Sequence, residues 1–280
     1  MTSPTLSPLH PHVHHNPDAP ILEVTKLTAR YDGQVALDEI TFHLHTGERV
    51  AVVGPNGAGK STLFKIVAGV LPPTSGDVKI SGFRPGGHIC IAYVPQRSQV
   101  DWHFPASVAD VVMMGRIGQV GLFRWPSHSD WDSVHSALEA VDMNAMANRQ
   151  IGELSGGQQQ RTFLARAMAQ EAELVLMDEP LNGLDTPSQE AILSLLEILR
   201  QKKITVMVAT HDLGQAASYF DRVMLLNHRL IRFGPPSEVL TADNLLHAYG
   251  GHAQLIKISD GTTALADSCC DGEDQNDQSS

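Results

Sequence analysis

The stretch RVAVVGPNGAGKST, residues 49–62, decides how this chain folds. It opens with an apolar run of the length of a buried strand, and Leu63, Ile66 and Val67 after it fall on one face of a helix. Between strand and helix, residues 54–61 fit the pattern G-x-x-x-x-G-K-[ST]. Glycines at these positions let the backbone turn its N–H groups inward at a helix N-terminus. The pattern therefore predicts a loop that binds the phosphate groups of a nucleotide.

We take the nucleotide to be ATP and expect the whole loop to contact it. Lys60 is expected to reach the β- and γ-phosphates, and Ser61 to offer its hydroxyl to Mg²⁺. The alternative is a glycine-rich turn without a ligand. The predicted ATP contacts are Gly54, Pro55, Asn56, Gly57, Ala58, Gly59, Lys60, Ser61 and Thr62.

A pair of acidic residues follows a second apolar run, LVLM at 174–177. In open α/β sheets, ligands bind at the carboxyl ends of the strands. We expect Asp178 to hold Mg²⁺ through water. Glu179 should point to the other side of the strand, because side chains alternate, and polarise a water for attack on the γ-phosphate. The alternative is two solvated acids at a strand end.

The motif LSGGQ at residues 154–158 comes just before a helical stretch at 158–169. Ser155 suits a helix N-cap, and the two glycines expose backbone N–H groups at the helix start. This predicts a second anion site, 101 positions after Gly54. One nucleotide can use both sites only if the fold brings them together or if a partner subunit supplies the second.

The motifs GPNGAGKS, LSGGQ and LVLMDE together resemble the nucleotide-binding domain of ATP-binding cassette (ABC) transporters. The resemblance covers about residues 21–235. It implies a head-to-tail dimer that sandwiches two ATP molecules between the phosphate loop of one subunit and the LSGGQ motif of the other. The opposite-subunit contacts would be Ser155, Gly156, Gly157 and Gln158.

Four further positions match the family's pattern. Tyr31 resembles the aromatic residue that stacks on adenine, and Gln96 the glutamine that senses Mg²⁺ and the membrane subunit. Asp185 lies in a loop that resembles the one crossing the dimer seam, and His211 resembles the histidine that contacts the γ-phosphate. The resemblance thus makes Glu179, His211 and Lys60 catalytic. Alternatively, Tyr31 is a turn tyrosine, Gln96 a solvated loop residue and His211 a helix-cap histidine.

The order of elements predicts the fold class. Strand patterns at 49–53, 174–177 and 205–209 alternate with helical ones, whereas 107–114, 131–141 and 158–169 are helical without strands between them. This order predicts an α/β protein with a mostly parallel sheet and an inserted α-helical subdomain. The resemblance to ABC proteins further implies that the sheet belongs to a P-loop NTPase core and that an N-terminal antiparallel β subdomain precedes it. The expected divisions are a flexible His/Pro-rich arm at 1–20, an ABC ATPase domain at 21–256 with its helical subdomain at about 97–160, and an acidic disordered tail at 257–280.

Composition narrows the function classes. The 280 residues are 42% hydrophobic and carry a net charge of −11, which argues against nucleic-acid binding. Six acids after residue 257 account for −6 of this, leaving −5 for the rest.

Three cysteines make no disulfide framework, so a reducing compartment is expected. Residues 1–20 contain no apolar stretch, so we expect no signal peptide there, and no apolar run of about 20 residues occurs in the sequence. We expect a peripheral protein on the cytoplasmic face of the cell membrane.

The segments VPQRSQVDWHFP (94–105) and VVMMGR (111–116) are similar to the ATPase subunits of manganese, zinc and iron importers that use a metal-binding solute receptor. This similarity implies a second copy of the chain, two polytopic membrane permease subunits and, indirectly, the receptor as partners. The alternative for four apolar side chains of these segments is that they are ordinary core of the helical subdomain: Trp102, Phe104, Met113 and Met114. The alternatives are a soluble non-transport ABC ATPase and an importer ATPase for a metal chelate such as a siderophore. The LSGGQ motif weighs against a P-loop kinase or GTPase.

The N-terminal arm carries closely spaced histidines. Imidazoles one residue apart can chelate Zn²⁺ or a related ion. The weaker hypothesis is that the arm senses or buffers the transported metal, and the alternative is a solvated arm without a metal role. The histidines are His10, His12, His14 and His15.

Overall fold

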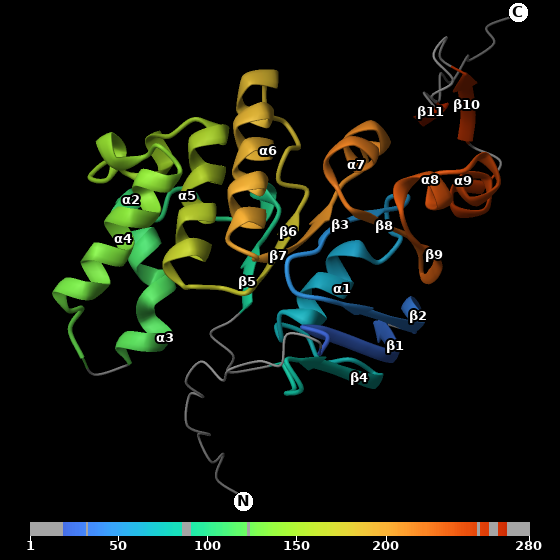
Figure 1. Ribbon diagram of the computed structural model, residues 1–280, viewed down its shortest axis with the longest axis horizontal. Helices are drawn as coiled ribbons and strands as arrows, with labels where there is room; N and C mark the ends of the chain where they lie inside the picture. The colour runs from blue at the N-terminus through green and yellow to red at the C-terminus, as the bar shows by residue number, and fades with distance from the viewer. Residues whose placement is uncertain are drawn as a thin grey trace, which may run out of the picture.

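The computed structural model describes residues 19–31, 33–85, 91–121 and 124–250, and the two strands at 253–257 and 263–267 (Figure 1). The arm histidines therefore lie outside the described residues. The strands are β1 Leu22–Tyr31, β2 Gln34–Leu44, β3 Arg49–Val53, β4 Ser75–Ile80, β5 Ile91–Val94, β6 Leu174–Asp178, β7 Thr205–Ala209, β8 Arg222–Asn227, β9 Arg229–Gly234, β10 Ala253–Lys257 and β11 Thr263–Asp267. The α-helices are α1 Lys60–Val67, α2 Val108–Met113, α3 Ile117–Val120, α4 His128–Ala140, α5 Gly156–Ala169, α6 Thr186–Gln201, α7 Leu213–Tyr219, α8 Pro236–Val239 and α9 Ala242–Tyr249. Short 3₁₀ turns occupy Arg97–Gln99, Met114–Arg116, Asn144–Met146 and Ile151–Glu153.

A six-stranded sheet with the order β5-β6-β7-β3-β8-β9 forms the centre of the molecule. Its neighbouring strands run parallel except for β8 and β9. Strand β3 separates two hydrophobic cores, because Ala51 and Val53 face one of them and Val50 and Val52 the other. Both faces of the sheet are therefore covered, which is why β3, β6 and β7 read as continuous apolar runs.

A smaller antiparallel sheet, β2-β1-β4, covers one side of the core. Helix α1 contributes Leu63 and Phe64 to the same hydrophobic cluster as Leu22 and Leu37 of this sheet. The start of α1, and with it the phosphate loop, is thereby held between the two sheets.

The helical lobe contains α2, α3, α4 and α5 and lies on the left of Figure 1. Ser107, Ser127 and Ser155 each form a capping box at the start of α2, α4 and α5. Arg116 ties the lobe together: its guanidinium donates to Asp130 Oδ1 at 3.2 Å, to the Ala169 carbonyl at 3.0 Å and to Glu171 Oε1 at 2.8 Å. With a parallel core, an antiparallel sheet and a helical insertion, the predicted fold class is confirmed.

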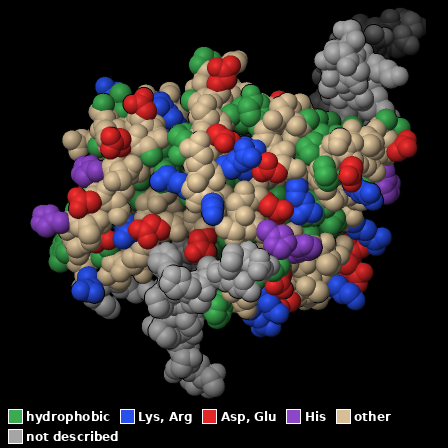
Figure 2. All heavy atoms as spheres, in the orientation of Figure 1, with side chains coloured by type: hydrophobic (Ala, Val, Ile, Leu, Met, Phe, Trp, Pro, Cys, Tyr) green, Lys and Arg blue, Asp and Glu red, His purple; other side chains and the backbone are tan. Residues whose placement is uncertain are grey.

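Two features differ from the sequence-based expectations. Strand β9, which pairs antiparallel with β8, was not predicted. Strand β11 lies inside the tail 257–280 that the composition predicts to be disordered, and it pairs with β10, which lies almost wholly before that tail. No helix among the described residues has the length and apolar character needed to cross a bilayer. On the face shown in Figure 2, acidic and basic side chains are interspersed.

Candidate nucleotide-binding site

The loop between β3 and α1 takes its shape from its glycines. Gly59 is the N-cap of α1, with φ 96°, and a Cβ there would lie 2.4 Å from the Ala36 carbonyl oxygen and 2.6 Å from Leu37 Cδ2. Gly57 has φ 80° and open space where a Cβ would be. A larger residue at position 59 would be excluded by β2, so the loop closes tightly on its outer side. Because Gly59 has no side chain to cap α1, the first N–H groups of the helix stay available to a ligand.

Lys60 is the first residue of α1, directly after the loop, and is only 6% exposed. Its ammonium donates to the carbonyl oxygens of Gly54 at 2.7 Å and Pro55 at 3.0 Å. Burial lowers the pKa of Lys60, while the nearby Glu179 and Asp178 raise it and so offset part of that effect. The structure thus places a desolvated cation beside two carboxylates.

Asp178 ends β6 and is 1% exposed. The Ser61 hydroxyl donates to its carboxylate, and Tyr93 Oη donates at 3.5 Å from the neighbouring strand. Burial is the main reason that the pKa of Asp178 is raised, with Glu179 adding to the shift, whereas Ser61 and two lysines act against it. The pKa of Tyr93 is also raised, first by burial and then by Asp178.

Glu179 lies one residue beyond β6, with φ 50°. The prediction that strand alternation sets its direction is therefore wrong: a left-handed backbone turns the side chain. Its N–H donates to the Ala209 carbonyl at 3.1 Å, which fixes the turn against the end of β7. Its Oε2 accepts one hydrogen bond from Gln96 Nε2 and another from Asn182 Nδ2, each at 3.1 Å. The carboxylate is thus held by two amides from different segments.

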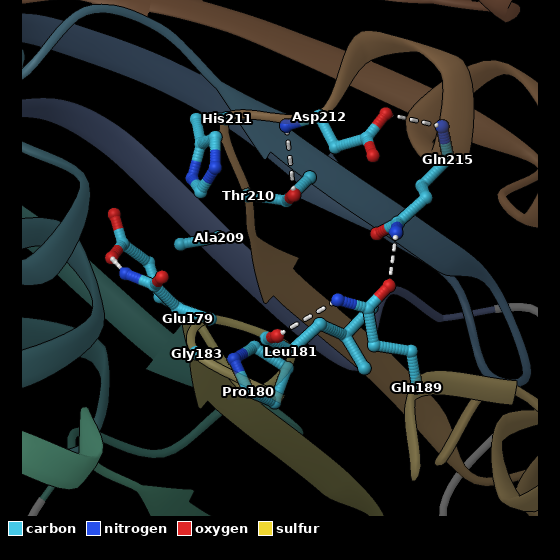
Figure 3. Close-up of a pocket in the computed structure, with 11 residues that line it drawn as sticks. Glu179, Pro180, Leu181, Gly183, Gln189, Ala209, Thr210, His211, Asp212 and Gln215 are labelled. Atoms are coloured by element: carbon cyan, nitrogen blue, oxygen red, sulfur yellow. Dashed lines mark hydrogen bonds between the residues drawn. The ribbon is translucent and has the colours of Figure 1, made fainter. Parts of the chain in front are cut away.

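A pocket opens between the ends of β6 and β7, with Glu179 and His211 on one side and Gln189 and Gln215 on the other (Figure 3). The alternative role of His211 as a helix cap is wrong, because Asp212 is the N-cap of α7 and accepts from the Gln215 N–H at 2.9 Å.

Two glutamines that the sequence analysis missed connect the walls of this pocket. Gln215 Nε2 donates to Gln189 Oε1 at 3.2 Å, and Gln189 Nε2 donates to the Leu184 carbonyl at 3.1 Å. They join α7 to the loop that precedes α6. No motif marks them, since the two residues are 26 positions apart and lie in different helices.

The LSGGQ motif starts α5 in the helical lobe. Ser155 Oγ accepts from the Gln158 N–H at 3.3 Å and Gln158 Oε1 accepts from the Ser155 N–H at 2.9 Å, so the predicted N-cap is confirmed. A Cβ on Gly157 would lie 2.5 Å from Ser188 Oγ, and one on Gly156 would lie 2.9 Å from Arg97 Nη1. Within the described chain, no hydrogen bond joins Ser155 or Gln158 to residues 54–62.

The remaining predicted residues lie at element ends. Tyr31 is 39% exposed at the end of β1, where its ring can be reached from solvent. Asp185 is the exposed N-cap of α6, and its side chain makes no capping hydrogen bond. Both side chains are therefore exposed to solvent rather than packed in the core.

The side chains gathered here suit a magnesium–nucleotide complex. A hydroxyl from Ser61, a carboxylate from Asp178 and the Gln96 amide present oxygen atoms, the ligands that Mg²⁺ prefers. Lys60 supplies a positive charge beside them. A phosphate loop, a buried carboxylate and a helical insertion together define a P-loop ATPase of the cassette type.

Comparison with known proteins places the chain in a family. Residues 37–182 match the family model described as ABC transporter, so the chain belongs to the ABC transporter family. It is 45% identical to the manganese transport system ATP-binding protein MntB of Bacillus subtilis, over 84% of this chain and 95% of that protein. It is 46% identical to the zinc transport system ATP-binding protein TroB of Treponema pallidum, over 82% of this chain and 87% of that one. Its fold also matches an inward-facing metal-chelate type ABC transporter with TM-score 0.75 and 30% identity, over 89% of this chain and 97% of that one.

Proposed function

We propose that this chain is the ATP-hydrolysing subunit of an importer for a transition-metal ion, namely manganese, zinc or iron. The observation that carries the proposal is the 3.1 Å hydrogen bond from Gln96 to Glu179. Gln96 belongs to the segment that resembles metal-importer ATPases, and Glu179 is the proposed catalytic base. The contact therefore links the segment that resembles those ATPases to the proposed catalytic base. The similarity to manganese and zinc transport proteins supports the cargo class.

The proposed reaction is attack of water on the γ-phosphate of ATP, which breaks the bond from the γ-phosphorus to the β,γ-bridging oxygen and releases ADP and phosphate. Glu179 orients the water and accepts its proton, which the hydrogen bonds from Gln96 and Asn182 allow by fixing its carboxylate. Lys60 turns from the loop carbonyls to the phosphate oxygens and neutralises charge there. His211, across from Glu179 in the same pocket, contacts the γ-phosphate. Mg²⁺, when bound at Ser61, Asp178 and Gln96, supplies Lewis acidity and neutralises phosphate charge.

The complete site in this proposal requires two copies of the chain. Ser155, Gly156, Gly157 and Gln158 belong to the helical lobe and would meet the nucleotide of the opposite subunit. Tyr31 would stack on adenine, and Asp185 would lie at the seam between the subunits. A head-to-tail dimer is the arrangement that lets the start of α5 act on a phosphate, since helix N-termini favour anions.

The proposed partners are two polytopic permease subunits and, through them, a metal-binding solute receptor. The chain would then act as a peripheral subunit on the cytoplasmic face of the membrane. Its net charge of −11 supports the expectation that nucleic acid is not a partner. The similarity to a metal-chelate type transporter favours one alternative, an importer ATPase for a chelated metal such as a siderophore complex.

Reconstitution tests this function directly. The chain is expressed with candidate permease subunits, such as any that neighbouring genes encode, and the complex is inserted into vesicles. Uptake of Mn²⁺, Zn²⁺, Fe²⁺ or a ferric siderophore is then measured with and without ATP. We expect ATP-dependent uptake of a free metal ion, abolished by Glu179→Gln. Uptake of the siderophore alone would favour the chelate alternative. Failure of the chain to associate with any permease would favour the non-transport ATPase.

A further inference from the structure

Two histidines outside the nucleotide site lie side by side at the end of β2. His43 is in the strand and His45 follows its last residue. Both histidines are exposed, whereas Phe42 before them and Leu44 between them are buried. Residues two apart in an extended chain project to the same face. Their imidazole rings are 5.4 Å apart between centroids, at an interplanar angle of 86°. Neither ring makes a hydrogen bond to any described residue.

We propose that His43 and His45 bind one divalent transition-metal ion. Two imidazoles on one tetrahedral ion, at the usual Zn–N distance of about 2.0–2.1 Å, place their ring centroids roughly 5 Å apart. The observed separation of 5.4 Å matches this value without a backbone change. The angle between the ring planes is free, because each ring can turn about its own metal–nitrogen bond.

The backbone at His43 and His45 is held by hydrogen bonds before any ion binds. His43 is paired with Glu23 in the antiparallel ladder between β1 and β2. The His45 N–H donates to Glu48 Oε2 at 3.0 Å, which holds the turn after the strand. A chelate whose ligands stand on ordered backbone loses little conformational entropy when the ion binds.

Acidic and basic side chains both lie near the pair: Glu48 contacts the His45 N–H, and Lys79 of β4 is paired with Glu23. Glu23 is directly opposite His43 on the same face of the sheet, where cross-strand side chains are near neighbours. Arg232 and His43 line the same surface groove between β2 and β9. No group of three or more His, Cys, Asp or Glu side chains suited to a metal occurs among the described residues, so the protein supplies two ligands and water fills the remaining positions.

The chemistry of the ligands selects the ion. Imidazole nitrogen suits Zn²⁺, Cu²⁺, Ni²⁺ and Co²⁺, whereas Mg²⁺ and Mn²⁺ favour oxygen ligands. The β2 site is therefore expected to bind Zn²⁺ more tightly than Mn²⁺. This selectivity does not depend on the transport function proposed above, because the transported metal and the metal bound by His43 and His45 need not be the same.

The histidine-rich arm joins the chain beside this pair. The Ile21 N–H donates to the carbonyl of Leu44, the residue between the two histidines, at 2.8 Å. His15 is six positions before Ile21, a span that reaches at most about 20 Å when extended. The experiment must therefore separate the strand pair from the arm, whose own histidines lie outside the described residues.

The test is a calorimetric titration of the full chain with Zn²⁺, in a background where His10, His12, His14 and His15 are each replaced by Gln. Excess Mg²⁺ occupies the oxygen ligands at Ser61 and Asp178. We expect one Zn²⁺ per chain, and about tenfold or greater loss of affinity in the double variant His43→Gln/His45→Gln. The matched control is His128→Gln/His135→Gln, which removes two exposed histidines on α4 and should bind as the background does.

Co²⁺ provides a second measurement, because tetrahedral coordination gives much stronger visible absorption than octahedral coordination. We expect the strong absorption in the background protein and its loss in His43→Gln/His45→Gln. Circular dichroism should show that this variant remains folded, since both side chains are exposed. Unchanged Zn²⁺ affinity in the variant, or tighter binding of Mn²⁺ than of Zn²⁺, would overturn the proposal.

Discussion

Arg97 Nε donates a 2.9 Å hydrogen bond to Gln159 Oε1, joining the segment after Gln96 to the helix that begins with the LSGGQ motif. Gln159 is 3% exposed, and its amide nitrogen also donates to the Ile151 carbonyl at 3.2 Å. Through Gln96, the same segment reaches Glu179. One short stretch of chain thus touches both the proposed catalytic base and the motif that would serve the opposite subunit.

Removing the hydrogen bond between Arg97 and Gln159 should break the link between the segment after Gln96 and the first turn of α5. We expect Arg97→Ala and Gln159→Leu each to destabilise the chain, and the double variant to lose less than the sum of the two. Because Arg97 is exposed and the bond is only partly buried, we expect a coupling free energy of about 1 kcal/mol. Urea unfolding of the four proteins measures it. Additivity within about 0.5 kcal/mol would show that the bond contributes nothing of its own.

Gly157 should resist substitution because of Ser188 in α6. A Cβ at position 157 would lie 2.5 Å from Ser188 Oγ and 2.7 Å from its Cβ. We expect Gly157→Ala to cost about 1–3 kcal/mol through this overlap and to lower ATP turnover. Adding Ser188→Gly removes both atoms, so it should restore most of the stability and activity.

The rescue separates packing from chemistry. The control is Ser188→Gly alone, which should cost only about 0.5–1 kcal/mol as a glycine in a helix. Thermal unfolding and steady-state ATPase rates are measured on all four proteins. A double variant as unstable as Gly157→Ala would mean that the clash with Ser188 is not the cause.

Local sequence signals are sufficient for the nucleotide loop. Strand β3 covers the same residues, 49–53, as the predicted apolar run, and Ser155 caps α5 as its type and position indicate. Both signals depend only on neighbours within one or two turns of chain. Strand periodicity, by contrast, gave the wrong direction for Glu179, because β6 ends one residue earlier and φ is 50°.

Contacts between distant segments could not be predicted in this way. Arg97 and Gln159 are 62 positions apart, and Gln189 and Gln215 are 26 positions apart in two different helices. Polar residues in helices and loops are most often solvated, so their sequence context carries no signal for such pairs. Strand β9 was missed because its side chains are only partly buried and do not alternate cleanly.

Glu179→Gln should separate binding from hydrolysis. The amide keeps an oxygen that can accept from Gln96 and Asn182, but it cannot take a proton from water. We expect ATP affinity to be retained and turnover to fall about 10²–10⁴-fold. Equilibrium binding and ATPase rates check this, and size-exclusion chromatography with ATP should show accumulated dimer. The control is Glu190→Gln, an exposed change on α6, which should bind and hydrolyse ATP as the parent does. Parental turnover in Glu179→Gln would refute the proposed role of Glu179 as catalytic base.

Asp178→Asn should stabilise the nucleotide-free chain while removing its response to magnesium. Burial is the main cause that raises the pKa of Asp178 above 3.8, so the folded chain binds this proton more readily than the unfolded chain. The stability from that proton is fully present below pH 3.8 and is lost as pH rises through the raised pKa. At neutral pH the ionised carboxylate therefore opposes folding, and a neutral amide relieves this.

Thermal unfolding with and without Mg²⁺ and ATP measures both effects. Without nucleotide, we expect the Tm of Asp178→Asn to exceed that of the parent, by about 2–4 °C for each kcal/mol gained. With Mg²⁺ and ATP, the parent should gain stability by mass action and the variant should gain much less. Asp132→Asn, an exposed change on α4, should alter neither value. A nucleotide-free Tm below the parent's would mean that the hydrogen bonds from Ser61 and Tyr93 outweigh the burial of the charge, because those donors favour the ionised carboxylate.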